Sequence, residues 1–158
     1  MPSIIEQFLH SAKYTGAVAA SSRYLAKKMV KRADLGSAKV IVELGPGTGA
    51  ITKYILKSKP AKARLITFEI NPEFVIALRK KYRKATHFLA DLLEMKKILK
   101  KEGIPKVDVI ISGIPFTNFS RAEIGRMLKA ISEVMGKKSR FVLFAYSKLK
   151  FRVFSHIG

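Results

Sequence analysis

Three glycines at alternate positions, Gly45, Gly47 and Gly49, follow an acidic residue near the end of an apolar run. The run spans residues 40–44 and contains Glu43. Glycine tolerates positive φ and lets a ligand approach the backbone closely. Such a turn between a strand and a helix therefore indicates a nucleotide-like cofactor. The pattern also satisfies the relaxed fingerprint of dinucleotide-binding turns, and a purely structural turn is the other alternative.

A second acid, Glu69, ends the next apolar run, 64–69, twenty residues after Gly49. A carboxylate at this place can accept hydrogen bonds from both hydroxyls of a ribose. We expect Glu69 and the following Ile70 to contact the cofactor. The alternative for Glu69 is an ordinary acid ahead of the helix that Pro72 begins. Neither observation separates a nicotinamide dinucleotide from other adenosine cofactors.

The ends of the third and fourth apolar runs help to make that distinction. Asp91 and Leu92 follow the run 86–90, where an Asp can accept from an adenine amino group, although it can equally cap a helix. The fourth run, 107–112, leads into the loop Ser-Gly-Ile-Pro-Phe, residues 112–116. Such a loop would present carbonyls and an aromatic face above a reacting centre. A dehydrogenase has no such requirement.

These residues must be positioned by an alternation of short apolar strands and helices, which predicts an α/β fold with a mainly parallel sheet covered on both faces. Ligands in such sheets bind beyond the carboxyl ends of the strands. We expect a helix from about Ser120, which with Glu123 forms a capping box, to about Gly136. Strands are expected at 40–44, 64–69, 86–90, 107–112 and 140–146, and the other helices at 4–9, from Ser21 or Ser22 onward, 51–59, 72–84 and 92–102.

The composition is strongly basic. Thirty-one Lys and Arg against eleven Asp and Glu give the 158-residue chain a net charge of +20. This favours a polyanionic partner, nucleic acid or an anionic membrane face, over a merely lysine-rich solvated surface. The absence of cysteine excludes disulfides and thiolate metal sites, and the three histidines lack metal-ligand spacing. No apolar run approaches the length of a bilayer span or a signal peptide core, so a cytoplasmic location is expected.

The motif series Glu-Leu-Gly-Pro-Gly-Thr-Gly (43–49), Glu69, Asp91-Leu92 and the loop 112–116 resembles that of class I S-adenosylmethionine (SAM) methyltransferases. Ribosomal RNA adenine dimethylases carry a fourth element similar to Asn-Leu-Pro-Tyr. Ser-Gly-Ile-Pro-Phe is closer to the Ser-Gly-Leu-Pro of bacterial phospholipid N-methyltransferases. Residues 8–30, with Thr-Gly-Ala followed by Ser-Ser-Arg, and residues 144–147 also resemble that family, although Ala20 stands where it usually has Pro.

The resemblance implies SAM as the cofactor, a Rossmann-like doubly wound sheet and two N-terminal helices. The family's sheet continues through two further strands, so this sheet is expected to be incomplete at its C-terminal side; residues 151–154 would begin strand six. The implied division is a segment 1–36, which would contact a membrane, and a SAM-binding domain 37–158. The implied cofactor-binding residues are Tyr14, Gly16, Glu43, Gly45, Gly47, Gly49, Glu69, Ile70, Asp91, Leu92 and Ser112. The catalytic candidates are Tyr14, Ser112 and Tyr146, with Glu6 as a further proton acceptor, and the substrate-binding residues are Ile114, Pro115 and Phe116, of which Phe116 could instead belong to the core.

The implied activity is N-methylation of the amino headgroup of a phospholipid such as phosphatidylethanolamine. The enzyme is expected to be a monomer attached reversibly to an anionic membrane through its basic N-terminal helices, with their apolar faces inward. These helices could instead simply cover the sheet. The alternative functions are an RNA adenine-N6 methyltransferase and a SAM-binding module without catalysis. The basic residues of the second N-terminal helix are Arg23, Lys27, Lys28, Lys31 and Arg32.

Overall fold

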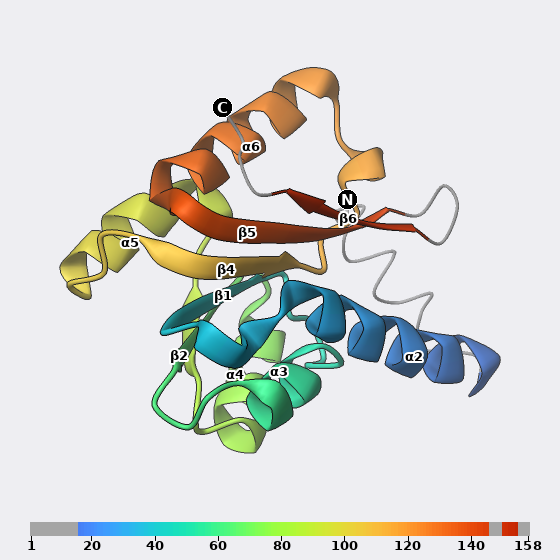
Figure 1. Cartoon of the computed structure of the whole chain (residues 1–158). Coiled ribbons are helices and arrows are strands. Elements are labelled where there is room, and N and C mark those ends of the chain that lie inside the picture. Colours follow the sequence, from blue (N-terminus) through green and yellow to red (C-terminus); the bar gives the residue numbers. More distant parts are fainter. Residues whose placement is uncertain (1–15, 146–149, 155–158) are drawn as a thin grey trace.

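The architecture is a six-stranded sheet with helices on both faces (Figure 1). A computed structural model describes residues 16–145 and 150–154 of the chain. The strands are β1 (Val40–Leu44), β2 (Arg64–Glu69), β3 (Thr86–Leu89), β4 (Val107–Ser112), β5 (Met135–Ala145) and β6 (Lys150–Phe154). The helices are α2 (Gly16–Ala33), α3 (Thr52–Ser58), α4 (Pro72–Lys81), α5 (Met95–Lys101) and α6 (Arg121–Val134), with short 3₁₀ turns η1 (Leu35–Ser37), η2 (Leu92–Glu94) and η3 (Phe116–Asn118).

The strand order β3-β2-β1-β4-β5-β6 places β1 at the centre of the topology. Strands β1 to β5 are parallel, and β1 pairs with both β2 and β4. Strands β2 and β3 lie on one side of β1, and the chain then returns to the other side of β1, where β4 lies. The order therefore switches at β1, where ligands of doubly wound sheets bind. The predicted Rossmann-like fold is confirmed.

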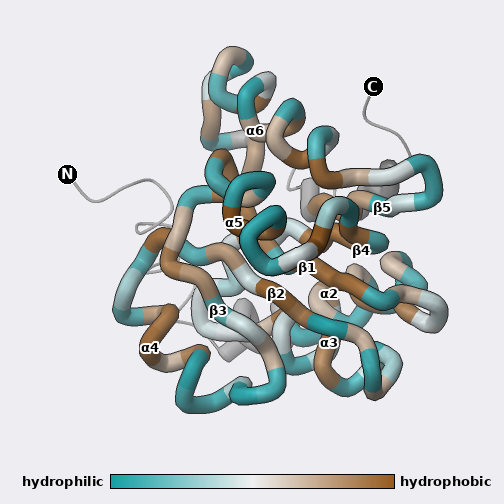
Figure 2. Tube along the Cα trace, turned by 90° about the vertical axis from the view of Figure 1, so that its left-hand side faces the viewer, coloured by the Kyte–Doolittle hydropathy of each residue, from teal (hydrophilic) through white to brown (hydrophobic). Residues whose placement is uncertain are grey.

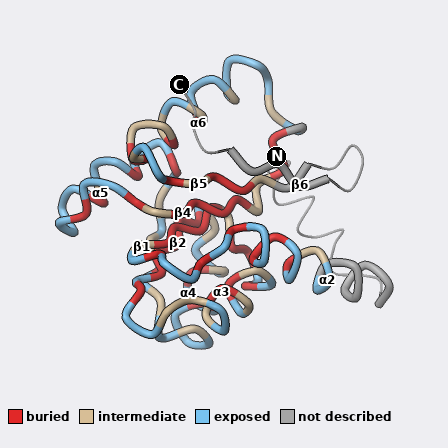
Figure 3. The backbone as a smooth tube through the Cα atoms, viewed as in Figure 1, coloured by how far each residue is buried: buried red, intermediate tan, exposed pale blue. Residues whose placement is uncertain are grey.

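Two apolar layers hold the helices to the sheet. One packs α5 and α6 against β1, β2 and β4 through residues such as Leu99 and Ile131. The other packs α2 and α3 against the opposite face, through residues such as Met29 and Ile55. The buried strands form a continuous band between the helical layers in Figure 3, and apolar residues follow them in Figure 2. This sandwich fixes the carboxyl ends of the strands relative to one another.

Helix α2 begins earlier than predicted. It starts at Gly16, so Ser21 and Ser22 lie within the helix and the prediction that either serine caps it is wrong. The alanine-rich sequence before the serines supports this extension, because alanine has the highest helix propensity. At the other end, the Arg140 side chain on β5 donates to the main-chain carbonyls of Ala33 and Asp34. This contact satisfies carbonyls that the helix end leaves without intrahelical partners.

The apolar face of α2 is buried against the sheet. Ala26, Met29, Val30 and Ala33 are at most 4% exposed. These residues are therefore not available to enter a membrane interface, and the expectation of an inward apolar face does not hold for this part of the helix. The basic residues on the other side of α2 are exposed. No helix in the described part of the chain is both long and apolar enough to cross a bilayer.

The C-terminal strands differ from the prediction at one boundary. The capping box of Ser120 and Glu123 is present at the start of α6. Strand β5, however, begins at Met135 rather than at residue 140. Met135 pairs with Val107 and Arg140 pairs with Val109, so residues 136–139 form a bulge between these two pairs. Ser139 stabilises this bulge by donating to the Val107 carbonyl and accepting from the Gly136 N–H. The strand expected at 151–154 is present as β6, which runs antiparallel to β5.

Candidate active site

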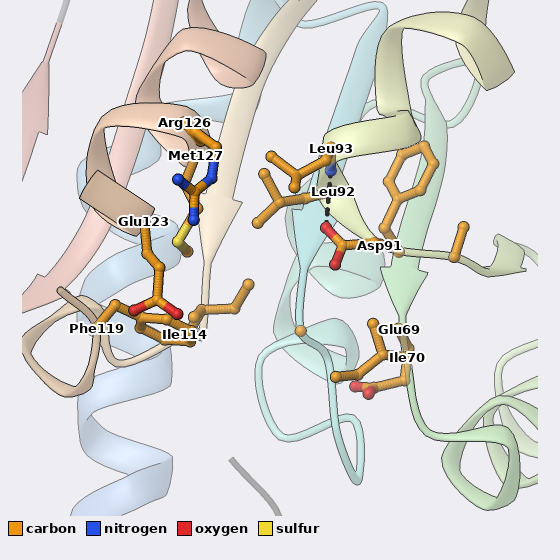
Figure 4. A pocket seen from close by; sticks show the side chains of 13 residues that line it. Glu69, Ile70, Asp91, Leu92, Leu93, Ile114, Phe119, Glu123, Arg126 and Met127 are labelled. Atoms are coloured by element: carbon orange, nitrogen blue, oxygen red, sulfur yellow. Dashed lines mark hydrogen bonds between the residues drawn. The ribbon is translucent and has the colours of Figure 1, made fainter. Parts of the chain in front are cut away.

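A cavity of about 190 Å³ opens at the carboxyl ends of the central strands (Figure 4). One wall comes from the ends of β2 and β3 and from η2, and the facing wall comes from α6 and the loop after β4. This is the edge at which the topology predicts a ligand site. The lining residues are Gly45, Phe68, Glu69, Ile70, Ala90, Asp91, Leu92, Leu93, Ile114, Phe119, Glu123, Arg126 and Met127.

The glycine turn contributes backbone rather than side chains. Gly45, which lines the cavity, has a φ of 62°, and a Cβ there would lie 2.7 Å from Ile114 Cγ1. Gly49 has a φ of 91°, and its Cβ would lie 2.3 Å from the Tyr82 ring. Both positions thus exclude larger residues, but for different reasons. Gly45 keeps the cavity open beside the loop after β4, whereas Gly49 lets the turn pack on α4.

Glu69 holds the turn in place and faces the cavity. Its side chain is 3% exposed. Its Oε2 accepts the Gly47 N–H and its Oε1 accepts the Asn71 N–H, each at 3.0 Å. A carboxylate has about four acceptor sites, so each oxygen retains capacity for one more donor. The geometry therefore allows Glu69 to accept ribose hydroxyls while it orders the peptide that approaches them.

Asp91 serves as a helix cap at the cavity wall. Its Oδ1 accepts the Leu93 N–H at 2.9 Å, which begins η2. Helix capping was the alternative role for Asp91, and it is present. It uses one of the two carboxylate oxygens, and Asp91 also lines the cavity together with Leu92. The cap thus fixes an acceptor at the place where an adenine amino group is expected.

Glu43 is a buried acid behind the glycine turn. It is fully buried; its Oε2 accepts from the Thr52 hydroxyl at 2.6 Å, and its Oε1 has no hydrogen-bond partner among the residues that the structure describes. Burial raises the pKa of Glu43 to about 8, against the opposing hydrogen bond from Thr52 and with a smaller contribution from the negative Glu69. A positive charge bound near the turn would favour the ionised carboxylate.

The loop after β4 has three different roles. The Ser112 side chain is fully buried and its Oγ accepts the Ile114 N–H at 3.1 Å, so it shapes the turn. Ile114 lines the cavity as expected of a substrate-binding residue. Pro115 is buried beside it. Phe116 packs against Phe141 at a ring-centroid distance of 6.1 Å, which places it in the core and away from the cavity lining.

Helix α6 supplies residues that the sequence motifs did not single out. Glu123, Arg126 and Met127 of α6 form much of one wall together with Phe119, which lies just before the helix, and Arg126 lies opposite Asp91 in Figure 4. Their spacing of three or four positions is that of one helix face. A periodicity analysis continued beyond the capping box would have found them. Because these residues are far from the glycine turn in the sequence, the motifs gave no sign that they line the same cavity.

Three predicted residues lie outside the described part of the chain: Glu6, Tyr14 and Tyr146. Gly16 is the first residue of α2. Their roles as cofactor ligands or proton acceptors stay predictions. His87 is a buried structural residue, since its ring nitrogens meet the Thr67 hydroxyl and the Tyr82 carbonyl. In the described ranges, no group of three or more His, Cys, Asp or Glu side chains is arranged to hold a metal ion.

Comparison with known families decides what binds at such a turn. Residues 5–147 match the family model described as an O-methyltransferase domain. The chain belongs to this family. With this match, the predicted membership in the class I SAM methyltransferases is confirmed, and SAM is the cofactor. The residues present fit it, because a buried carboxylate with an unpartnered oxygen and the acceptor Glu69 lie at a turn open to a cationic, ribose-bearing molecule.

Two curated relatives are methyltransferases of different kinds. An ornithine lipid N-methyltransferase from Singulisphaera acidiphila is 28% identical over 138 residues, which cover 85% of this chain and 72% of the relative. A ribosomal RNA small subunit methyltransferase A from Thermotoga neapolitana is 31% identical over 105 residues. That alignment covers 66% of this chain and only 38% of the relative.

The fold is also that of solved SAM enzymes. The SAM-bound structure of CalS10, an amino pentose methyltransferase from Micromonospora echinaspora, superposes with a TM-score of 0.63 and 15% sequence identity. The superposition covers 89% of this chain and 55% of that chain. At such low identity the likeness concerns the fold alone.

Proposed function

We propose that this protein transfers a methyl group from SAM to the amino headgroup of a lipid, with phosphatidylethanolamine as the first candidate. The observation that carries the proposal is the extent of the match to the ornithine lipid N-methyltransferase, which covers 85% of this chain and 72% of that enzyme. The Ser-Gly-Ile-Pro loop supports the same choice, because its resemblance is to phospholipid N-methyltransferases. The family description names oxygen as acceptor, so the acceptor atom is itself part of the proposal.

The chemistry required of the protein is positioning. SAM supplies a methyl group already activated on a sulfonium. The chain must hold an uncharged amine in line with that methyl in a dry site, and intramolecular reactions of this kind gain roughly 7–11 kcal/mol from orientation. Ile114 at the cavity edge and the buried Pro115 give the loop after β4 an apolar, stiff surface for this purpose.

The amine must also lose a proton before it can attack. A free alkylamine has a pKa near that of lysine, about 10.4, so most of it is charged at neutral pH. The Ser112 side chain is buried and its hydroxyl oxygen accepts the Ile114 N–H, so we propose that Ser112 stabilises the loop rather than taking part in the proton transfer. Tyr14 and Tyr146 remain our candidates for orienting the amine or accepting its proton.

We further propose that the enzyme works at an anionic membrane surface, to which residues 1–36 contribute positive charge. The apolar side of α2 is occupied by the sheet, so this contact is electrostatic in the described part of the helix. Basic residues near an anionic leaflet contribute about 1 kcal/mol each. Such attachment is reversible and weakens with salt.

A methylation assay tests the proposed acceptor. The protein is incubated with methyl-labelled SAM and, separately, with vesicles containing phosphatidylethanolamine, vesicles containing ornithine lipid, and unmodified ribosomal RNA. We expect label in a lipid fraction, on nitrogen, and none in RNA. Label in RNA alone would overturn the lipid assignment.

The second candidate is an RNA adenine methyltransferase. It is favoured by the net charge of +20 and by the 31% identity to the ribosomal RNA enzyme. The loop after β4 weighs against it, since Ser112 stands where the adenine dimethylases carry Asn. The RNA arm of the same assay decides between the two candidates.

A further inference from the structure

Helices α2 and α3 form a lysine-lined groove on the face of the sheet away from α6. The two helices lie side by side beneath the sheet in Figure 1 and contact one another. Each contributes two lysines spaced by four residues: Lys27 and Lys31 on α2, and Lys53 and Lys57 on α3. Residues four apart lie on the same side of a helix, so each pair is a like-charge pair and destabilises its helix slightly.

Tyr54 organises these lysines. The ammonium groups of Lys27, Lys53 and Lys57 lie 5.5, 5.7 and 5.7 Å from the centroid of its ring. Cation–π attraction at such distances holds a cation in place without neutralising it. Three positive charges from two helices are therefore gathered around one aromatic side chain.

A hollow of about 370 Å³ lies between the two helices; Lys27 and Lys31 line it, and Lys53 and Lys57 lie beside it around the Tyr54 ring. Its polar lining includes Lys27, Lys31, Tyr54 and Ser58, and its base includes the buried residues Val30 and Leu35. The one acid in the lining, Asp34, lies 3.8 Å from an Arg140 guanidinium nitrogen. Among the residues that the structure describes, none of the four lysines has a carboxylate within ion-pair distance. The groove thus combines space, a polar rim and uncompensated positive charge.

We propose that the groove between α2 and α3 binds the phosphate headgroup of an anionic lipid and so orients the enzyme on the membrane. The proposal rests on the lipid substrate proposed above and adds a second lipid site, distinct from the cofactor cavity. Lysine ammonium groups act as point charges that suit a phosphate. An ionic contact from the lipid would also relieve the repulsion within both lysine pairs.

The aromatic residues favour a lipid surface over nucleic acid. Bases of single-stranded nucleic acid stack on open aromatic faces. The Tyr54 ring is instead surrounded by three lysines. Tyr24, which is 59% exposed, has Lys28 at 5.0 Å from its ring and shares a helix face with Lys27 and Lys31. An exposed tyrosine among lysines suits the boundary between lipid and water, where one end of the ring is apolar and the other wet.

Vesicle flotation with the full chain tests the site. The variant Lys53→Gln/Lys57→Gln is compared with wild type on vesicles of phosphatidylcholine and phosphatidylethanolamine, with and without phosphatidylglycerol. Two lysines at about 1 kcal/mol each correspond to a partition coefficient lowered about 30-fold on the anionic vesicles. The matched control is Lys97→Gln/Lys101→Gln on α5, which removes two exposed lysines at the same spacing from the opposite side of the sheet.

The results separate this proposal from the proposed function. We expect the α3 variant alone to lose anionic binding, while it methylates phosphatidylethanolamine in neutral detergent micelles at the wild-type rate. Equal losses of vesicle binding in both double variants would show that only the net charge matters and would overturn the proposed site. Unchanged flotation of the α3 variant would also overturn it. Loss of ribosomal RNA binding by the α3 variant without loss of vesicle binding would overturn the lipid assignment. Selective flotation loss with no lipid methylation by any form would retain the groove and refute the proposed function.

Discussion

The cofactor cavity and the α2–α3 groove have opposite electrostatic character within one strongly basic protein. Three of the eleven acidic residues of the chain, Glu69, Asp91 and Glu123, line the cavity together with one basic residue, Arg126. The groove is lined by two lysines and one acid that is close to Arg140, and two further lysines lie around its Tyr54 ring. The net charge of +20 is therefore a property of the outer surface and not of the reaction site. A cationic cofactor and an anionic surface can thus be bound by different regions.

The largest effect is expected from removing the cavity's central acid. Glu69→Ala should weaken S-adenosylhomocysteine binding by about 100-fold or more, because hydrogen bonds to a charged group contribute about 1.5–3 kcal/mol each and the ribose offers two. The turn would also lose the acceptor for the Gly47 N–H. Isothermal calorimetry measures the change, with Glu73→Ala on the exposed start of α4 as control. Equal affinities for wild type and Glu69→Ala would show that the ribose lies elsewhere.

The next effect concerns the packing of the glycine turn. Gly49→Ala should lower the free energy of unfolding by about 3 kcal/mol, from left-handed backbone strain together with the overlap with Tyr82. Gly103→Ala is the control, because Gly103 has a φ of 73° and a Cβ added there would meet nothing within 4 Å. It should cost about 1 kcal/mol. Urea denaturation gives both values, and equal losses would contradict the steric role of Tyr82.

The buried acid predicts a dependence of stability on pH. The folded-state pKa of Glu43, about 8, lies above its ordinary value of 4.5, so the folded protein retains a proton that the unfolded chain releases. The contribution of Glu43 to stability is therefore present below pH 4.5 and is lost as pH rises towards 8, with a slope of up to about 1.4 kcal/mol per pH unit.

The substitution Glu43→Gln isolates this contribution, since glutamine resembles the protonated acid in shape. Urea midpoints of the cofactor-free protein between about pH 5 and pH 8 should fall with pH more steeply in wild type than in the variant. A wild-type slope equal to that of Glu43→Gln would mean that Glu43 is ionised throughout.

The smallest effect is expected from removing the positive charge of Arg126, which tests the sign of the electrostatic potential in the cavity. Arg126 lies on the α6 wall opposite Asp91 and is exposed to solvent. Arg126→Gln should tighten binding of the cationic SAM by about two- to threefold at low salt, because an exposed charge contributes about 0.2–1 kcal/mol. Calorimetry at low and high salt measures this difference. Weaker binding by the variant would identify Arg126 as a contact of the adenosyl group.

The sequence predicted those features that depend on local patterns. The strand-turn-helix at Gly45, the acid at the end of β2 and the capping box at Ser120 each follow from neighbouring residues. It missed features that depend on tertiary contacts. The α6 wall of the cavity comes from a helix that the cofactor motifs did not include.

The burial of Phe116 illustrates the same limit, whereas the start of α2 differs from the prediction for a local reason. Ser21 and Ser22 are good cap residues, but an alanine-rich segment before them continues the helix. Phe116 follows the proline of a cofactor-site loop, yet Phe141 on β5 lies close enough to hold it in the core. Spacing along the chain gives no information about such partners, because they are brought together only by the packed sheet.

The most direct test of the central claim is a titration of the isotope-labelled protein with S-adenosylhomocysteine, followed by backbone amide NMR. We expect shifts at Gly45, Glu69 and Leu93 and at their neighbours around the cavity, with the amides of Lys27 and Lys31 on α2 unmoved. Shifts concentrated on α2 and α3, or saturation of binding without shifts at the carboxyl ends of β1 to β3, would contradict it.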